Sequence, residues 1–340
     1  MIIKEVERPS LKKIIKAIKF KPTAKPELLL DVLLVGSGKG AIALVLKYLI
    51  NKGIIKNKLD EVLMPSWLGY WVYNQIQPYA FPVKSYSSRV KIILAYHQYG
   101  FPQKMEKILD FANKNNIVVI EDCAHAVSSS YQGKAVGLFG DYAIYSYSKW
   151  LSCFALGGIR AKDKNFYQFA QNLISSAPFG LTFFKDTIKL FSDLSKFAKS
   201  KLFYKYSNLL LRMIYAIYDE ALKPGRLASK LLYNGLNGEI KLRQERYRTF
   251  INKTYHLGIC DHLEKEGITP YVIPIICEEA KGEKLIRTLA DAGIMTGFRY
   301  FDINRNLLEP NYQKSIIIPC HGGITDDQFS NMIEIIIKIV

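Results

Sequence analysis

The sequence lacks the features of secreted, membrane-spanning and disulfide- or zinc-stabilised proteins. Among its 340 residues no apolar run is long enough to cross a bilayer, and the densest one, residues 209–218, is short and interrupted by Arg212. The first ten residues carry acids and a proline instead of an apolar signal core, so we do not expect secretion. The five cysteines are scattered without C-x-x-C spacing, which favours reduced thiols over disulfides or zinc. We therefore expect a cytoplasmic protein without a metal site.

Acidic residues are also scarce. The chain has 30 Asp and Glu against 47 Lys and Arg, for a formal net charge of +17. Such an excess fits nucleic acid, an anionic membrane or phosphorylated small molecules. The lysines are spread along the chain and no nucleic-acid-binding module is recognisable, so we expect no nucleic-acid partner. A solvated lysine-rich surface is the favoured interpretation, with two richer stretches at residues 12–21 and 185–205.

Repeats and low-complexity tracts are absent, and the chain instead alternates strand and helix patterns up to Ile159. The apolar patterns predict strands at residues 29–35, 62–65, 90–96, 117–122 and 142–147, and helices at 41–51, 70–76 and 104–113. Alternation at this spacing predicts a doubly wound, mostly parallel sheet in an α/β fold. A chain of this length exceeds the usual limit of one core, which predicts a large domain and a smaller one.

The second half predicts a helical region followed by a small α/β unit. Residues 166–232 are mainly helical by pattern, and Pro224–Gly225 interrupts them. A helix at 239–256 then leads into strands at 271–276 and 315–318 and helices at 284–292 and from Asp326, where Thr325–Gln328 is close to a capping box. We expect a large domain over residues 1–238, with a helical insertion at about 166–232, and a small domain over 239–340.

Two residues that end apolar strands are the main candidates for chemistry. Asp122 closes V-V-I-E-D, and Lys149 follows the aromatic strand that ends in Y-S-Y-S-K. The carboxyl ends of parallel strands share one edge of a sheet, where ligands bind. An acid and a lysine placed there suit pyridoxal phosphate (PLP), because the amine forms a Schiff base and the carboxylate keeps the pyridine nitrogen protonated.

A glycine-rich turn, G-S-G-K-G at residues 36–40, lies between a predicted strand and helix, where backbone amides favour anions. It is no Walker A loop, because Leu33 and Gly40 occupy two of the required positions. It also departs from the G-x-G-x-x-G dinucleotide fingerprint. A single phosphate held by the amides of Gly38 and Lys39 fits better, and a tight turn without a ligand is the alternative.

Six segments resemble, in order, motifs of the DegT/DnrJ/EryC1/StrS family of PLP-dependent sugar aminotransferases. They are S-G-K-G-A-I at 37–42, M-P-S-W at 64–67 with Asn74, H-Q-Y-G at 97–100, E-D-C-A-H-A at 121–126, Q-G-K-A-V-G-L-F-G-D at 132–141, and S-Y-S-K at 146–149 followed by Gly157–Gly158. The resemblance implies the type I fold of PLP-dependent transferases. That fold has a mostly parallel, mixed sheet of the seven-stranded type and a smaller C-terminal α/β domain.

The resemblance also implies a role for each matching residue. Lys149 would hold the cofactor covalently and then move a proton, while Asp122 would pair with the ring nitrogen. His125 would lie against the ring or its 3′-oxygen, although a packed histidine is the alternative. The other cofactor contacts would be the phosphate-binding Gly38, Lys39 and Ser146, and a stacking aromatic residue, Trp67 or Tyr70.

From the family we expect transfer of an amino group from L-glutamate to a nucleotide-linked keto-sugar, in the synthesis of surface polysaccharide such as lipopolysaccharide. Arg299 is a candidate contact for the nucleotide diphosphate, and a homodimer with shared active sites is expected. Two departures indicate unusual substrate recognition. Lys39 replaces the threonine of the phosphate turn, and no counterpart of the N-x-R-M segment is found.

Three alternatives stay open at this point. A sugar dehydratase on the same fold can replace the lysine by histidine, so Lys149 favours transamination. A catalytically idle homologue could serve as a binding or assembly subunit. A nicotinamide-dependent oxidoreductase would need the fingerprint that residues 36–40 do not supply. For the basic stretch at 185–205 a structural role, in a dimer interface or over the sheet, is favoured over weak peripheral contact with an anionic membrane.

Overall fold

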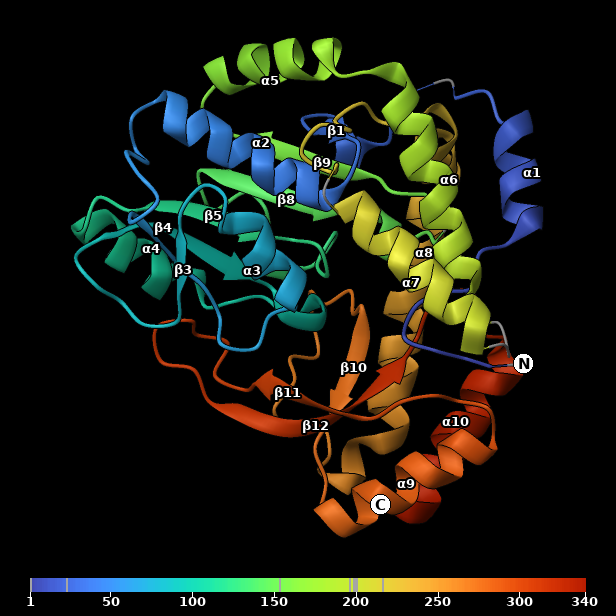
Figure 1. Ribbon diagram of the computed structural model, residues 1–340. Coiled ribbons are helices and arrows are strands. Elements are labelled where there is room, and N and C mark those ends of the chain that lie inside the picture. Colours follow the sequence, from blue (N-terminus) through green and yellow to red (C-terminus); the bar gives the residue numbers. More distant parts are fainter. Residues whose placement is uncertain (1, 23, 153, 196, 198–200, 216) are drawn as a thin grey trace.

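A seven-stranded sheet forms the centre of the first half of the chain in the computed structural model, which describes residues 2–22, 24–152, 154–195, 197, 201–215 and 217–340 (Figure 1). In sheet order the strands are β1 (Leu33–Val35), β9 (Gly157–Ala161), β8 (Tyr142–Ser146), β5 (Val118–Asp122), β4 (Val90–Tyr96), β2 (Glu61–Leu63) and β3 (Phe81–Val83). The five from β8 to β3 are parallel, and β9 runs antiparallel to both β8 and β1. The predicted mostly parallel, mixed α/β sheet is confirmed.

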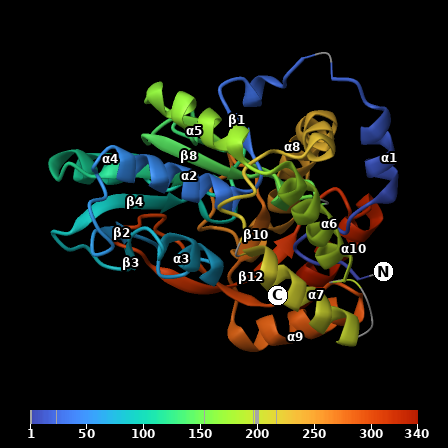
Figure 2. The ribbon, with the colours of Figure 1, turned by 45° about the horizontal axis from the view of Figure 1, so that its top comes forward.

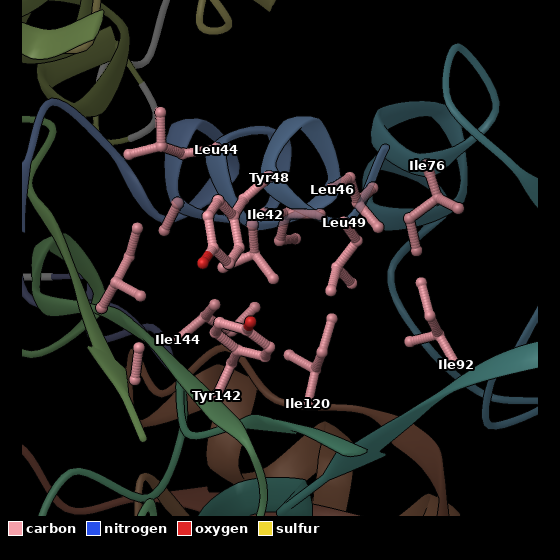
Figure 3. Packing of buried hydrophobic residues seen from close by; sticks show 14 of the residues in the cluster. Ile42, Leu44, Leu46, Tyr48, Leu49, Ile76, Ile92, Ile120, Tyr142 and Ile144 are labelled. Carbon is pink, nitrogen blue, oxygen red and sulfur yellow. The ribbon is translucent and has the colours of Figure 1, made fainter. Parts of the chain in front are cut away.

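Helices cover both faces of this sheet because alternate residues of a strand point to opposite sides. On one face Ile92 and Leu94 of β4 join the core formed with α2 (Gly38–Asn51) and α5 (Asn165–Ser176). Figure 3 shows Ile42, Leu46 and Leu49 of α2 directed at strand residues Ile92, Ile120 and Ile144. On the other face Ile93 and Ala95 pack with α4 (Met105–Lys114). The short α3 (Tyr70–Ile76) occupies the predicted residues.

The C-terminal part contains a second sheet of three antiparallel strands. In order they are β10 (Val272–Ile275), β12 (Tyr312–Pro319) and β11 (Phe298–Asp302), packed with α9 (Glu279–Asp291) and α10 (Asp326–Ile339). The predicted capping box is confirmed, because the Gln328 amide donates to the Thr325 hydroxyl and the Thr325 amide donates to the Gln328 side chain. The sequence analysis did not predict β11.

The long helix α8 (Arg226–Thr254) joins the two sheets, so the predicted helix start at Glu239 is wrong. Gly225 caps the helix and no proline interrupts the residues that follow. Leu232 and Leu236 pack in the core under the large sheet, whereas Tyr247 and Phe250 pack in the C-terminal core. Because α8 contributes to both cores, the division of the chain at residue 238 stays a prediction.

The helical insertion contains α6 (Phe179–Ser195) and α7 (Lys201–Tyr215), which pack together beside the N-terminal helix α1 (Leu11–Lys19) in Figures 1 and 2. Among the described residues no helix combines the length and apolar character needed to span a bilayer. The predicted strand at 29–35 is wrong over its first residues, which form a 3-10 turn. The remaining short elements are η1 (Glu27–Leu29), η2 (Gln98–Gly100), η3 (Tyr147–Lys149), η4 (Tyr255–Leu257), β6 (Ser130–Tyr131) and β7 (Lys134–Ala135).

Candidate active site

A cavity of about 370 Å³ lies at the carboxyl edge of the large sheet, as the strand-end argument predicts. Tyr96, Asp122 and Ser146, the last residues of β4, β5 and β8, all line it, and so does Lys149. Tyr96 and Asp122 are direct partners in the parallel ladder. The structure therefore brings the two predicted catalytic residues into one buried site.

The side chain of Lys149 forms a hydrogen bond with His125. The Lys149 amine lies 2.9 Å from His125 Nε2, and the Tyr96 hydroxyl lies 2.5 Å from His125 Nδ1. The imidazole also stacks on the Tyr271 ring, with centroids 4.1 Å apart and planes 12° apart. These three contacts hold the imidazole in one orientation at the wall of the cavity, and its role toward the cofactor stays a prediction.

Burial shifts the ionisation of all three polar groups. It lowers the pKa of Lys149, although the charge of Asp122 opposes that effect. It raises the pKa of Asp122, against the charge of Lys149 and a 3.0 Å hydrogen bond from the Ala124 amide. Burial and then the charge of Lys149 lower the pKa of His125 well below its usual 6.5. Near neutral pH the imidazole is therefore uncharged beside the lysine.

The first turn of α2 forms another wall of the cavity through Ser37, Gly38 and Lys39. The Ser37 hydroxyl accepts the Gly40 amide at 2.9 Å and the Ser37 carbonyl accepts the Ala41 amide at 3.0 Å. The amides of Gly38 and Lys39 precede these at the open end of the helix, where an anion is favoured. Gly38 lies against Ser146, since a Cβ added there would be 2.8 Å from that of Ser146. The three predicted phosphate-binding residues thus lie together.

The Lys39 side chain points into an aromatic cluster. Its amine lies 3.1 Å from the ring centroid of Tyr215, 4.8 Å from that of Trp71 and 5.7 Å from that of Tyr218. Burial, and then the charge of Lys149, lowers the pKa of Lys39 to about 6, while Asp219 opposes the shift. The residue that departs from the family motif is therefore a neutral, aromatic-enclosed amine at neutral pH.

Two predicted stacking residues, Trp67 and Tyr70, are not among the described residues that line the cavity. Trp67 is 50% exposed and stacks on Tyr300 with ring centroids 4.2 Å apart, and Tyr70 is 70% exposed. Tyr70 does not line the cavity because it is the first residue of α3, and the side of the helix that faces the cavity carries Val72. The rings that line the cavity are those of Tyr96, Tyr215, Tyr218 and Tyr271, and a stacking role for Trp67 or Tyr70 stays a prediction.

The helical insertion supplies residues that sequence reasoning missed. Lys189 and Asp193 of α6 form an ion pair and line the cavity together with Tyr215 and Tyr218. No pattern in the sequence marks these positions. Tyr96 is different, because it ends a strand next to Asp122 and the strand-end argument would have found it. Glu5 and Val6, from the N-terminal segment, complete this wall.

The basic stretch at 185–205 is not uniformly a surface feature. Lys185 is fully buried, and its amine donates to the Gly36 carbonyl at 2.6 Å, directly before the α2 turn. Arg299, the predicted nucleotide contact, is exposed on β11 and outside the described cavity lining. Its guanidinium donates to the neighbouring Phe298 carbonyl, so its role toward substrate stays a prediction.

One group of metal-ligand types occurs among the described residues. The donor atoms of His97, Glu121 and Cys123 lie within 4.8 Å of one another, and all three side chains are buried. The Glu121 carboxylate already accepts three backbone amides, at 2.7 Å each, and contacts His97 Nε2 at 3.0 Å. Its oxygens are thus occupied in fixing the loop at 137–140, so we assign this cluster a structural role.

Residues 83–176 match the family model of the DegT/DnrJ/EryC1/StrS aminotransferase family. The resemblance to that family is confirmed. The curated relatives agree: a GDP-perosamine synthase from Escherichia coli O157:H7 is 40% identical over 83 residues, which are 24% of this chain and 23% of that one. A dTDP-3-amino-3,6-dideoxy-alpha-D-galactopyranose transaminase from Aneurinibacillus thermoaerophilus is 48% identical over 61 residues, 18% of this chain and 17% of that one. Each match thus spans less than a quarter of the relative.

Solved structures match over nearly the whole chain. The aminotransferase TlmJ from Streptoalloteichus hindustanus has a TM-score of 0.67 at 16% identity, covering 99% of this chain and 98% of that one. PseC from Helicobacter pylori, an aminotransferase involved in pseudoaminic acid biosynthesis, has the same TM-score and identity and covers 98% of each chain. At this identity the likeness establishes the fold, and the predicted fold of PLP-dependent sugar aminotransferases is confirmed.

Proposed function

We propose that this protein is a cytoplasmic, PLP-dependent aminotransferase that transfers the amino group of L-glutamate to a nucleotide-linked keto-sugar for glycan or polysaccharide synthesis. The observation that carries the proposal is the joint placement of Lys149, Asp122 and the α2 N-terminus in one buried cavity. A lysine, a carboxylate and an anion-binding helix end are the three groups that PLP needs. The matching segment, residues 83–176, contains both Asp122 and Lys149.

The residues present fit the cofactor. The amides of the first α2 turn and the Ser146 hydroxyl suit its phosphate. Because Gly38 has no side chain, the α2 turn can lie directly against Ser146, where a Cβ would be only 2.8 Å from that of Ser146. Asp122 lines the cavity and keeps one oxygen on the Ala124 amide. That carboxylate suits the pyridine nitrogen, and the Lys149 amine suits the aldehyde. When bound, PLP would supply an electron sink and carry the amino group between donor and acceptor.

The chain's own side chains would manage the protons. Because burial lowers the pKa of Lys149, a larger fraction of its amine is deprotonated and able to act as a nucleophile or base. Asp122 would hold a proton on the ring nitrogen, and the charge of Lys149 opposes the effect of burial on the pKa of its carboxyl group. His125 orients the amine through its 2.9 Å contact. The rings of Tyr215, Tyr218 and Tyr271 also line the cavity.

The acceptor class rests on the relatives, which are named for GDP-, UDP- and dTDP-linked amino sugars. The phosphates of a nucleotide diphosphate are bound by cationic side chains. Lys189 in the cavity wall would contact them, and Arg299 is a further candidate. Glutamate as donor and a homodimer with shared active sites are also part of the proposal.

The test begins with the absorbance spectrum of the purified protein mixed with PLP. We expect a visible band, and reduction with borohydride followed by peptide mapping should place the cofactor on Lys149. The band should bleach with L-glutamate, and Lys149→Ala should abolish both the adduct and transamination. Lys162→Ala, which removes an exposed lysine of the same domain, is the matched control.

The outcomes separate the proposal from its rivals. A bound cofactor on Lys149 that bleaches with glutamate and yields an amino-sugar product supports the aminotransferase. Loss of a sugar hydroxyl without amino-group transfer would identify a dehydratase on the same fold. No band and no adduct at saturating PLP would contradict catalysis and favour a binding or assembly subunit.

A further inference from the structure

The helix α7 carries an exposed apolar stripe formed by Leu202, Tyr206, Leu209 and Met213. The side chains of these residues are between 56% and 64% exposed. Their spacing of four, three and four residues places them on one face of a helix. The other face is already occupied, because Leu210 and Tyr215 pack with Ile188 of α6 and with Tyr218. The residues of the stripe therefore do not contribute to the hydrophobic cluster that α7 forms with α6.

Basic residues accompany the α7 stripe. Lys205 and Arg212, each one residue from a member of the stripe, are both exposed. The sequence of α7, K-L-F-Y-K-Y-S-N-L-L-L-R-M-I-Y, contains no acidic residue at all. A helix with one apolar face, basic flanks and no acids is the type that lies in the interface of an anionic bilayer.

The helix α1 repeats this pattern. Leu11, Ile15 and Ile18 form a second exposed stripe, spaced by four and three residues, and Leu11 is 71% exposed. The sequence of α1, L-K-K-I-I-K-A-I-K, contains four lysines and no acid. In Figures 1 and 2 α6 lies between α1 and α7, and Ile14 of α1 and Leu190 of α6 pack in one hydrophobic cluster.

We infer that the stripes of α1 and α7, with their basic flanks, dock this protein on the surface of an anionic lipid membrane. The charge pattern selects the partner. A second copy meeting the same surface would bring basic residues against basic residues, which is unfavourable, whereas anionic headgroups complement them. Nucleic acid would match the charge but leave the apolar stripes in water. The formal net charge of +17 also attracts the protein to an anionic membrane surface from a greater distance.

Docking would leave the candidate active site accessible to water-soluble reactants at its other walls. The inner side of the α6–α7 pair, through Lys189, Asp193 and Tyr215, lines the cavity, while the α7 stripe lies on the outer side. Membrane binding and cofactor binding therefore use different residues. The inference does not depend on the proposed catalytic function and is tested separately from it.

The experiment is co-sedimentation of the full-length protein with vesicles of phosphatidylglycerol mixed with phosphatidylcholine, against vesicles of phosphatidylcholine alone. We expect binding to the anionic vesicles, weakened by high salt, and little binding to the neutral ones. The double variant Leu202→Ser/Leu209→Ser should lower the affinity by about tenfold or more, because it removes two apolar anchors. Lys205→Gln/Arg212→Gln should lower the affinity and reduce its salt dependence.

The control is Leu59→Ser, which removes an equally exposed leucine (65%) far along the chain from both helices. It should bind as the wild type does. Circular dichroism and the PLP absorbance spectrum should be unchanged in every variant, because each substituted side chain is exposed. Absence of binding to anionic vesicles, or equal binding by Leu202→Ser/Leu209→Ser, would overturn the inference. Light scattering that shows the same variant converting a dimer to a monomer, without a change in lipid binding, would assign the surface to a second copy instead.

Discussion

The amine of Lys149 lies 2.9 Å from Nε2 of His125, so the lysine proposed to hold the cofactor is already oriented by an uncharged imidazole. The imidazole is itself fixed by the Tyr96 hydroxyl and the Tyr271 ring. Tyr96 belongs to β4 of the large sheet, and Tyr271 lies just before β10. Correct orientation of Lys149 therefore depends on the packing of the C-terminal part against the large sheet.

Replacing His125 should impair the chemistry without unfolding the protein. In His125→Leu the Lys149 amine loses a hydrogen bond involving a chargeable group, worth about 1.5–3 kcal/mol, which corresponds to a rate reduced by about 10- to 100-fold. His125→Gln retains a polar partner and should lose less. The measurements are kcat and the pH dependence of the absorbance of bound PLP. Wild-type values of both in His125→Leu would show that the contact has no part in catalysis.

Asp122→Asn separates the charge of the carboxylate from its structural role. Asparagine still accepts the Ala124 amide, so we expect an unchanged midpoint of unfolding. It lacks the negative charge that raises the pKa of Lys149 and would hold a proton on the cofactor, so we expect activity to fall by about 10²- to 10⁴-fold. Single-turnover kinetics with PLP-loaded protein measure the loss. Asp31→Asn, at an exposed position, is the control, and full activity of Asp122→Asn would contradict the assigned role.

Lys39 should make the stability of the cofactor-free protein depend on pH. Its pKa falls from 10.5 to about 6 on folding, so between these values the unfolded chain holds a proton that the folded chain releases. Stability should then rise with pH across that window, by at most about 1.4 kcal/mol per pH unit from this group. In Lys39→Met this pH dependence disappears. The free energy of unfolding of the variant should therefore exceed that of the wild type by the largest amount near pH 6, the lower end of the window.

Urea unfolding of the wild type and Lys39→Met at several pH values between 6 and 10.5 measures this difference. Lys58→Met is the control, because solvent surrounds that exposed amine in the folded and the unfolded chain alike. A constant difference between wild type and Lys39→Met over the whole window would refute the assigned protonation.

Gly157→Ala should disrupt the proposed phosphate site from the neighbouring strand. A Cβ at Gly157 would lie 2.3 Å from the Ser37 carbonyl carbon and oxygen and 2.6 Å from the Gly38 nitrogen. These are backbone atoms and cannot rotate away, so we expect a loss of about 1–3 kcal/mol of stability and weaker PLP binding. Denaturation and PLP titration measure both effects. Gly238→Ala, where nothing lies within 4 Å, should leave PLP binding unchanged, and equal behaviour of the two variants would contradict the geometry.

Local pattern was sufficient for much of the first half of the chain. The strand Val90–Tyr96 and the helix Tyr70–Ile76 have the predicted bounds, because strand and helix periodicities are properties of neighbouring residues. Strands β9 and β11 were missed, since β9 contains the glycine pair that weakens a strand pattern and the first residues of β11 are not buried. The start of α8 was missed because its first half faces one core and its second half another, which no single periodic pattern records.

By itself the sequence determined the α/β fold, the resemblance to the DegT/DnrJ/EryC1/StrS family and the placement of Asp122 and Lys149 at one cavity, because parallel strands place their carboxyl ends at one edge wherever the chain runs between them. Only the tertiary structure decided which aromatic rings enclose that edge. Tyr271 and Tyr215 reach the cavity from segments over a hundred and over sixty residues beyond Lys149, respectively, whereas Trp67 turns away toward Tyr300. The side on which a ring is buried depends on the packing of distant elements, and that information is not present in any local run of residues.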